Sequence, residues 1–176
     1  TGVGAAQTWR IESDRELEAY LAAKPPVDYI VEEFVSAPIV TYDGLTDRQG
    51  RVVFDASLEF DRGIMEVVNQ DLELQYTALR TIPADLAAAG RALVAAFGVR
   101  ERFFHFEFFR LQTGGLVALE VNVRPPGGFT VDMWNFQNDI DIYREWGNLL
   151  VKGRVESHAA RPHFVTWVGR KDRFRY

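Results

Sequence analysis

The chain has 176 residues, 47% of them hydrophobic, which is enough for one sizeable core or for two small lobes that share a cleft. With 20 basic and 25 acidic residues, the formal net charge is −5, and this balance excludes the general footprint of a nucleic-acid-binding protein. The sequence has no cysteine, which excludes disulfides, thiolate metal sites and a thiol nucleophile. Because no apolar run approaches the ~20 residues of a membrane span and no signal peptide is visible, we expect a cytoplasmic protein without membrane partners.

The first 35 residues combine a glycine-rich opening with one helix and one strand. Residues 2–5 (GVGA) would let backbone N–H groups approach a phosphate closely, although a flexible terminus is an equally good interpretation. Ser13 followed by Glu16 is a capping-box pattern, which predicts a helix that ends near Ala23, before two prolines. Residues 28–35 (DYIVEEFV) predict a strand, which is either an edge strand with outward charges or a backbone hinge for a flat base.

Three further strands and a strong helix are predicted in the middle of the chain. Residues 39–45 read as a strand, and a turn at 46–50 leads into a strand at 51–60 that returns antiparallel. Residues 72–79 are expected to form an edge strand. A helix should begin at Pro83 and have Gly98 as its C-cap.

The C-terminal part contains a tight loop, a helix and a last strand. The loop is residues 125–128 (PPGG), and the segment after it, 129–138, is either a packed cap or the wall of a substrate pocket. A helix is predicted at 139–152 and a strand at 164–168. Antiparallel strand pairs with helices between them predict an α+β fold.

The most informative stretch is a hairpin between these parts, residues 103–128. Its turn reads as a two-residue Gly-Gly loop at 114–115. Strand alternation then separates a polar from an apolar side of the second strand. The polar side is expected to carry Leu116, Ala118, Glu120, Asn122 and Arg124. The apolar side, expected to face the core, carries Val117, Leu119, Val121 and Val123.

Three oxygen-bearing side chains converge on the polar face in this prediction. The expected register places Glu107 opposite Asn122 and Phe109 opposite Glu120. Two carboxylates this close repel each other unless a cation or proton lies between them, and carboxylate and amide oxygens suit Mg²⁺. The alternative is a solvated strand face with scattered charges. Five phenylalanines in the seven residues from Phe103 weigh against it, because a carboxylate in apolar surroundings needs a partner.

Arg124 and the three histidines are further candidates for a functional role. Arg124 follows the ligand strand on the same face, where it forms a structural ion pair or holds a carboxylate or phosphate bidentately. The histidines His105, His158 and His163 are dispersed, so a zinc site or a catalytic triad has little support. We expect His105 to be a packed strand residue.

Taken together, these segments resemble the ATP-grasp superfamily, which includes D-alanine–D-alanine ligase, biotin carboxylase and many carboxylate–amine ligases. The resemblance covers nearly the whole chain in order, from the glycine-rich loop and the IVEEFV hinge to FHFEF and EVNVRPPGG, the most specific motif. It implies an ATP-grasp-type antiparallel sheet with flanking helices, incomplete at the N-terminus. Residues 1–35 would be a remnant of the lid subdomain, and residues 36–176 the C-terminal subdomain with the metal hairpin. The family's N-terminal lobe and phosphate-binding lysine are expected before Thr1.

The resemblance also implies roles for individual residues. The ligands of Mg²⁺, or of Mn²⁺ in its place, that bridges the phosphates of ATP would be Glu107, Glu120 and Asn122. Arg124 would be a catalytic residue that neutralises phosphate or acyl-phosphate charge. The adenine hinge would consist of Glu32, Glu33, Phe34 and Val35. The mobile loop over the phosphates would consist of Gly2, Val3, Gly4 and Ala5.

The implied activity is ATP-driven ligation of a small-molecule carboxylate to an amine through an acyl phosphate, in which the protein supplies positioning and charge neutralisation. Two alternatives stay open. One is a non-catalytic or truncated nucleotide-binding or assembly module with the same fold, and the other is a metal-dependent hydrolase. We also expect a homodimer or a covered sheet edge, because a strand missing before Thr1 would leave an edge unpaired.

Overall fold

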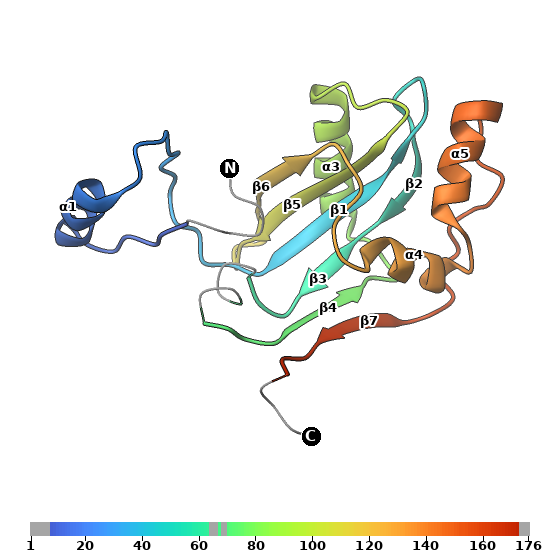
Figure 1. The fold of residues 1–176 in the computed structure, drawn as a ribbon. Coiled ribbons are helices and arrows are strands. Elements are labelled where there is room, and N and C mark those ends of the chain that lie inside the picture. Colours follow the sequence, from blue (N-terminus) through green and yellow to red (C-terminus); the bar gives the residue numbers. More distant parts are fainter. Residues whose placement is uncertain (1–7, 64–66, 68–69, 173–176) are drawn as a thin grey trace.

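Seven strands of the computed structural model form one antiparallel sheet in the order β6-β5-β1-β3-β4-β7, with β2 paired to β1 beside β3 (Figure 1). The structure describes residues 8–63, 67 and 70–172. The strands are β1 (Ile39–Thr46), β2 (Val52–Ala56), β3 (Leu58–Phe60), β4 (Leu74–Ala78), β5 (Phe103–Arg110), β6 (Leu116–Asn122) and β7 (Val165–Gly169). The helices are α1 (Asp14–Ala23), α3 (Ala84–Ala96), α4 (Thr130–Asn138) and α5 (Ile142–Lys152). The predicted α+β class is confirmed.

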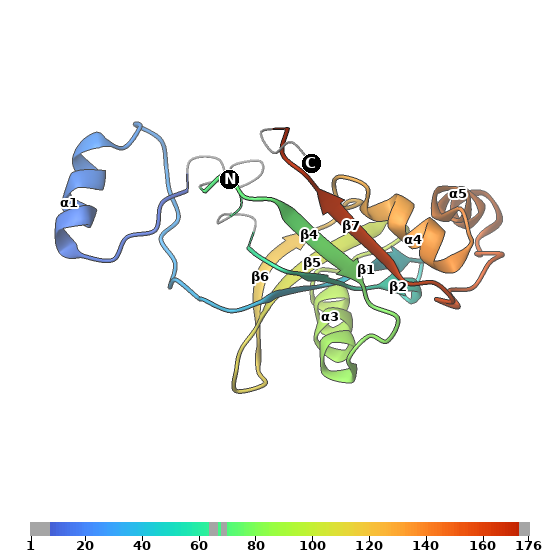
Figure 2. The same ribbon diagram turned by 90° about the horizontal axis from the view of Figure 1, so that it is seen from below.

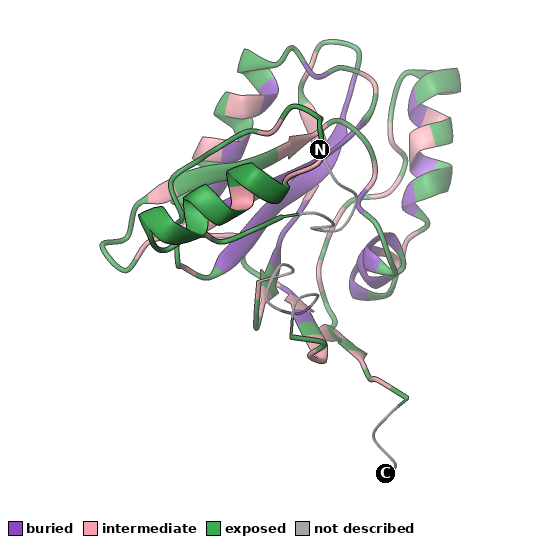
Figure 3. Ribbon diagram, turned by 60° about the vertical axis from the view of Figure 1, so that its left-hand side comes forward, coloured by how far each residue is buried: buried purple, intermediate pink, exposed green. Residues whose placement is uncertain are grey.

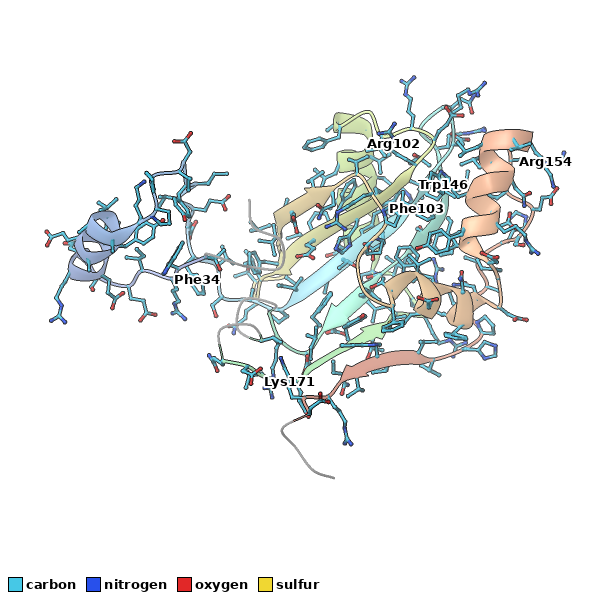
Figure 4. The ribbon with its side chains drawn as sticks, viewed as in Figure 1. Phe34, Arg102, Phe103, Trp146, Arg154 and Lys171 are labelled. Atoms are coloured by element: carbon cyan, nitrogen blue, oxygen red, sulfur yellow. The ribbon has the colours of Figure 1, made fainter. Side chains whose placement is uncertain are left out.

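Helices cover both faces of this sheet, α3 on one side and α4 with α5 on the other (Figure 2). The strand period of two explains the division, because neighbouring side chains point to opposite faces. On the α3 face, a buried cluster includes Tyr42, Phe104 and Phe106. On the opposite face, Phe103 packs beside Trp146, with ring centroids 5.3 Å apart (Figure 4). The central strands are therefore buried on both sides (Figure 3).

Helix α1 forms as predicted but lies apart from the sheet (Figures 1 and 2). Its start follows the sequence signal, since Ser13 Oγ accepts a hydrogen bond from the backbone N–H of Glu16 at 3.3 Å. The helix, described throughout, has no buried residue. Each helix formed by residues 8–63, 67 and 70–172 is too short or too polar to span a lipid bilayer.

The prediction of a strand at residues 28–35 is wrong. This segment contains no strand in the structure, and Ile30 and Val31 are 74% and 85% exposed. Its β-branched composition favours a strand, but strand structure also needs a partner, and no described strand pairs with this segment. The glycine-rich residues 2–5 lie outside the described residues.

The central strands follow the prediction with two differences. The strand expected at 51–60 is divided into β2 and β3, and the Leu58 N–H at the break donates to Thr41 Oγ1 at 2.9 Å. The strand expected at the sheet edge, β4, pairs with both β3 and β7. The strand order therefore ends at β6 and β7, a fact that local sequence does not encode.

Local sequence signals predicted the end of α3 to within one residue, but they did not predict α4 or the start of α5. Helix α3 ends with Phe97 as its C-cap, one residue before the predicted Gly98, which follows it at φ +59°. The backbone N–H of Val99 bonds to the carbonyl of Val94 at 3.0 Å, as in a Schellman motif. The helix expected at 139–152 begins only at Ile142, and the preceding segment forms α4, which the sequence reading missed.

The hairpin of β5 and β6 forms, but its turn and register differ from the prediction. The turn has three loop residues, 112–114, with Gly114 at φ +88° and a hydrogen bond from Gly114 N–H to the Leu111 carbonyl. Glu107 consequently lies opposite Glu120, and His105 lies opposite Asn122. Around Glu107 the register shifts by two residues, which leaves Glu120 and Asn122 on their predicted face.

A bulge in β6 overturns part of the predicted division into polar and core sides. Glu107 pairs with Glu120, but Phe108 pairs with Ala118, so Leu119 is an extra residue on this strand. As a result Leu116, predicted on the polar side, packs against the α3 cluster. Of the residues predicted to face the core, three are exposed at about two fifths because β6 is an edge strand: Val117, Leu119 and Val123.

Candidate functional site

Two glutamates face each other at the β5–β6 edge of the sheet. Glu107 on β5 is directly opposite Glu120 on β6, and Asn122 is the next residue of β6 on the same face. Directly opposed side chains have their Cβ atoms roughly 4.5–5.5 Å apart. Glu107 is half-buried and Glu120 is exposed, while Asn122 Nδ2 is buried without a hydrogen-bond partner. The structure thus brings the three predicted ligands together on one face.

Behind Glu107 lies a buried chain of polar side chains that crosses from β1 to β5. His105 Nδ1 is 2.6 Å from Asp43 Oδ1, and His105 Nε2 is 3.1 Å from Glu107 Oε1. Thr41 Oγ1 donates to the other oxygen of Asp43 and accepts from the Leu58 N–H. Strand pairing explains the alignment, because Thr41 is opposite Glu107 and Asp43 is opposite His105. The carboxylate of Glu107 is therefore the outer end of an ordered network.

The charges of Asp43 and Glu107 determine the protonation state of His105. Burial lowers the pKa of His105, but the charges and hydrogen bonds of Asp43 and Glu107 outweigh it and raise that pKa to about 10. Burial raises the pKa of Asp43, against the lowering effects of His105 and Thr41. A histidine held between two carboxylates keeps its proton at neutral pH, so both ring nitrogens donate. The packed strand residue expected at position 105 is thus a buried link between two acids.

The sequence reading did not find Thr41 and Asp43. The only local signal is that two polar residues share one side of an otherwise apolar strand, TYDGL. Their partners lie on β5, and the interval between Asp43 and His105 is 62 residues. Strand order is needed to bring them together.

No protein-family model matches the chain, and no curated protein matches it. Solved structures with a similar fold include the following two. An L-amino acid ligase from Bacillus licheniformis superposes with a TM-score of 0.66 at 18% identity, covering 89% of this chain and 41% of the other. The phosphoribosylaminoimidazole carboxylase ATPase subunit from Aquifex aeolicus gives 0.59 at 14% identity, covering 77% and 39%. Both are ATP-grasp proteins.

The chain has the ATP-grasp fold. It spans about two fifths of the length of these two solved chains. At such low identity the likeness extends to the fold and not to a particular activity.

The residues predicted to form an adenine hinge lie away from the glutamate pair. Glu32 and Glu33 are exposed, and Val35 is partly buried. The Arg10 guanidinium carbon lies 4.1 Å from the centre of the Phe34 ring. Figure 4 shows Phe34 on the segment between α1 and β1, to the side of the hairpin. The structure does not gather these residues around Glu107.

The predicted catalytic arginine lies just beyond the end of β6. Arg124 is exposed, and its Nη1 donates to the carbonyl of Pro125 at 2.9 Å. The chain then crosses from the β6 edge toward β4, where Gly128 lies beside the Tyr76 hydroxyl. Among the residues suggested as a pocket wall, Trp134 is fully buried in the core under α4. The segment is thus a helix that packs on the core through Trp134, while Phe136 is 71% exposed.

The donor chemistry of the site suits a hard cation. In the part of the chain that the structure describes, no three His, Cys, Asp or Glu side chains are grouped to hold a metal ion. The predicted set is different, with two carboxylates and one amide, and oxygen donors of this kind are those that Mg²⁺ prefers. The unpartnered buried atom of Asn122 is its amide nitrogen, which donates hydrogen bonds and therefore fits an acceptor group of a ligand rather than the cation itself. Metal binding by these residues stays a prediction.

Proposed function

We propose that this protein is an ATP-dependent ligase of the ATP-grasp type, which activates a carboxylate as an acyl phosphate for attack by an amine. The observation that carries the proposal is the direct opposition of Glu107 and Glu120 on a sheet of ATP-grasp fold. Two like charges in this arrangement destabilise the sheet, and a divalent cation offsets them. We infer that this charge pair serves binding, with His105 compensating the charge of Glu107 in the metal-free protein.

In this proposal Glu107, Glu120 and Asn122 hold Mg²⁺. The ion, when bound, neutralises charge on the phosphates of ATP. Arg124 follows the ligand strand, and its guanidinium can donate to phosphate or acyl-phosphate oxygens. The adenine contact of residues 32–35 rests on the sequence resemblance alone, and it requires this segment, which belongs to no strand of the described structure, to come closer to Glu107.

The reaction proceeds in two displacements. A carboxylate oxygen of the substrate attacks the γ-phosphorus, and ADP leaves. The amine nitrogen then attacks the acyl carbon, a proton leaves that nitrogen, and inorganic phosphate departs. The protein contributes alignment and charge neutralisation more than covalent chemistry.

Calorimetry with a non-hydrolysable ATP analogue tests the proposal. We expect binding that requires Mg²⁺ and that weakens at least tenfold in Glu120→Gln, because one anionic ligand is lost. Glu59→Gln is the matched control, since Glu59 is an exposed glutamate of β3 opposite Val40. An isotherm of Glu120→Gln that equals wild type contradicts the metal assignment. Absence of Mg²⁺-dependent binding in wild type contradicts the proposed function.

Phosphate release distinguishes the ligase from the hydrolase. A ligase should release phosphate from ATP only when a carboxylate and an amine are both supplied, and mixtures of amino acids are a reasonable first panel. Steady release without any acceptor would instead support a metal-dependent hydrolase.

A further inference from the structure

The chain of hydrogen bonds that ends at Glu107 runs from the buried interior of the sheet to its β5–β6 edge. It starts at the Leu58 N–H, continues through Thr41 and Asp43, and passes through His105 to the glutamate. Asp43 and Thr41 are fully buried, and the side chain of His105 is 9% exposed. All of these side chains lie on the sheet face that carries Glu120, and Glu107 is the member directly opposite it. Each inner member is held by the one behind it.

We propose that His105 and Asp43 are positioning residues, which fix the Glu107 carboxylate in the orientation that receives the metal–nucleotide complex. This inference rests on the proposed function. Glutamate has a long, flexible side chain, and ordering it at the moment of binding costs conformational entropy. The hydrogen bond at Glu107 Oε1 orders it beforehand. Partners of this kind behind a metal ligand typically change metal affinity 10- to 100-fold when removed.

A purely structural role makes a different prediction. Asp43 is a buried acid, and His105 is its charged partner 2.6 Å away. If the pair serves only to join β1 and β5, the contact that matters is the one between these two residues. If it serves to position Glu107, the contact at Nε2 matters most for ligand binding.

Two substitutions at position 105 separate these roles. The amide of His105→Asn overlaps the position of Nδ1, so it keeps a donor toward Asp43 and loses the one toward Glu107. The amide of His105→Gln extends to the position of Nε2, so it keeps the donor toward Glu107. Positioning predicts that asparagine weakens Mg²⁺-dependent binding of the ATP analogue at least tenfold, and that glutamine restores most of it. Binding measured without Mg²⁺ should be the same in both variants.

The control variant is His158→Asn, at an exposed histidine far along the chain. Circular dichroism and thermal unfolding accompany each measurement. If asparagine binds the Mg²⁺ complex as wild type does, or if glutamine is the weaker of the two, the positioning role is overturned. A wild-type protein without Mg²⁺-dependent binding overturns the proposed function as a whole, which is a distinguishable result.

A measurement on the unsubstituted protein covers the case in which a variant does not fold. Nuclear magnetic resonance of the histidine ring nitrogens reports on His105, with exposed His158 and His163 as internal references. Adding Mg²⁺ with the ATP analogue should shift the Nε2 signal of His105 and leave the other two unchanged. Equal shifts, or none, contradict the coupling between His105 and the ligand site.

Discussion

Replacing Glu120 with glutamine should stabilise the metal-free protein, although it weakens the proposed site. Glu120 lies directly opposite Glu107, and two unit charges roughly 5 Å apart in water repel by about 0.8 kcal/mol. The solvent value applies because Glu120 is exposed, and the contact of Glu107 with charged His105 reduces the repulsion further. We expect a gain of about 0.3–0.8 kcal/mol, which is ~1–3 °C in melting temperature for a chain of this length.

Thermal unfolding followed by circular dichroism measures this gain. It should shrink at ~1 M salt, where the screening length falls to about 3 Å. Adding Mg²⁺ with an ATP analogue should reverse the order of stability, because only wild type then gains the full binding energy. Glu59→Gln, opposite Val40 and Thr77, should show neither effect. If Glu120→Gln is less stable than wild type in metal-free buffer, the charge argument is refuted.

Three further predictions concern helix packing, the pH dependence of stability and the oligomeric state. Gly90→Ala should lower stability by more than 2 kcal/mol despite a gain of about 1 kcal/mol in helix propensity, because its Cβ would lie 1.9 Å from the Tyr42 ring. Gly147→Ala in α5 has nothing within 4 Å and should be stabilising, so urea unfolding that ranks the two alike contradicts the packing account. Burial raises the pKa of Glu145, but hydrogen bonds from backbone N–H groups and Ser157 lower it below its usual value. The stability it contributes is therefore present above about pH 4.3 and lost as pH falls through the lowered pKa. Glu145→Gln should cost about 1–3 kcal/mol at pH 7 and less near pH 3, and a difference that is constant with pH in urea unfolding would count against this. Light scattering at high protein concentration should show a dimer, or a monomer if a segment covers the exposed edges of the sheet. A monomer whose edge strands exchange their backbone amide hydrogens freely would contradict this expectation.

Elements with strong local signals were predictable, and those that depend on partners were not. The cap at Ser13 and the C-terminal motif of α3 are encoded within a few residues, so both helices appear where expected. Residues 28–35 have strand composition, but no described strand pairs with them. The two glycines at 114–115 suggest a two-residue loop, whereas the backbone uses only Gly114 in the left-handed region. Helix α4 has neither the N-cap side-chain hydrogen bond of α1 nor the proline N-cap of α3, so neither of these start signals marks it.

That Glu107, Glu120 and Asn122 share one face was predictable from local sequence, because side chains alternate along a strand and the two-residue error in register preserves that alternation. The polar side chains that hold Glu107 were not predictable in this way. Asp43 and Thr41 reach His105 and Glu107 because β1 lies next to β5, a neighbour relation between segments some 60 residues apart. Local sequence specifies which way a side chain points along its own strand, whereas strand order specifies which side chains it meets.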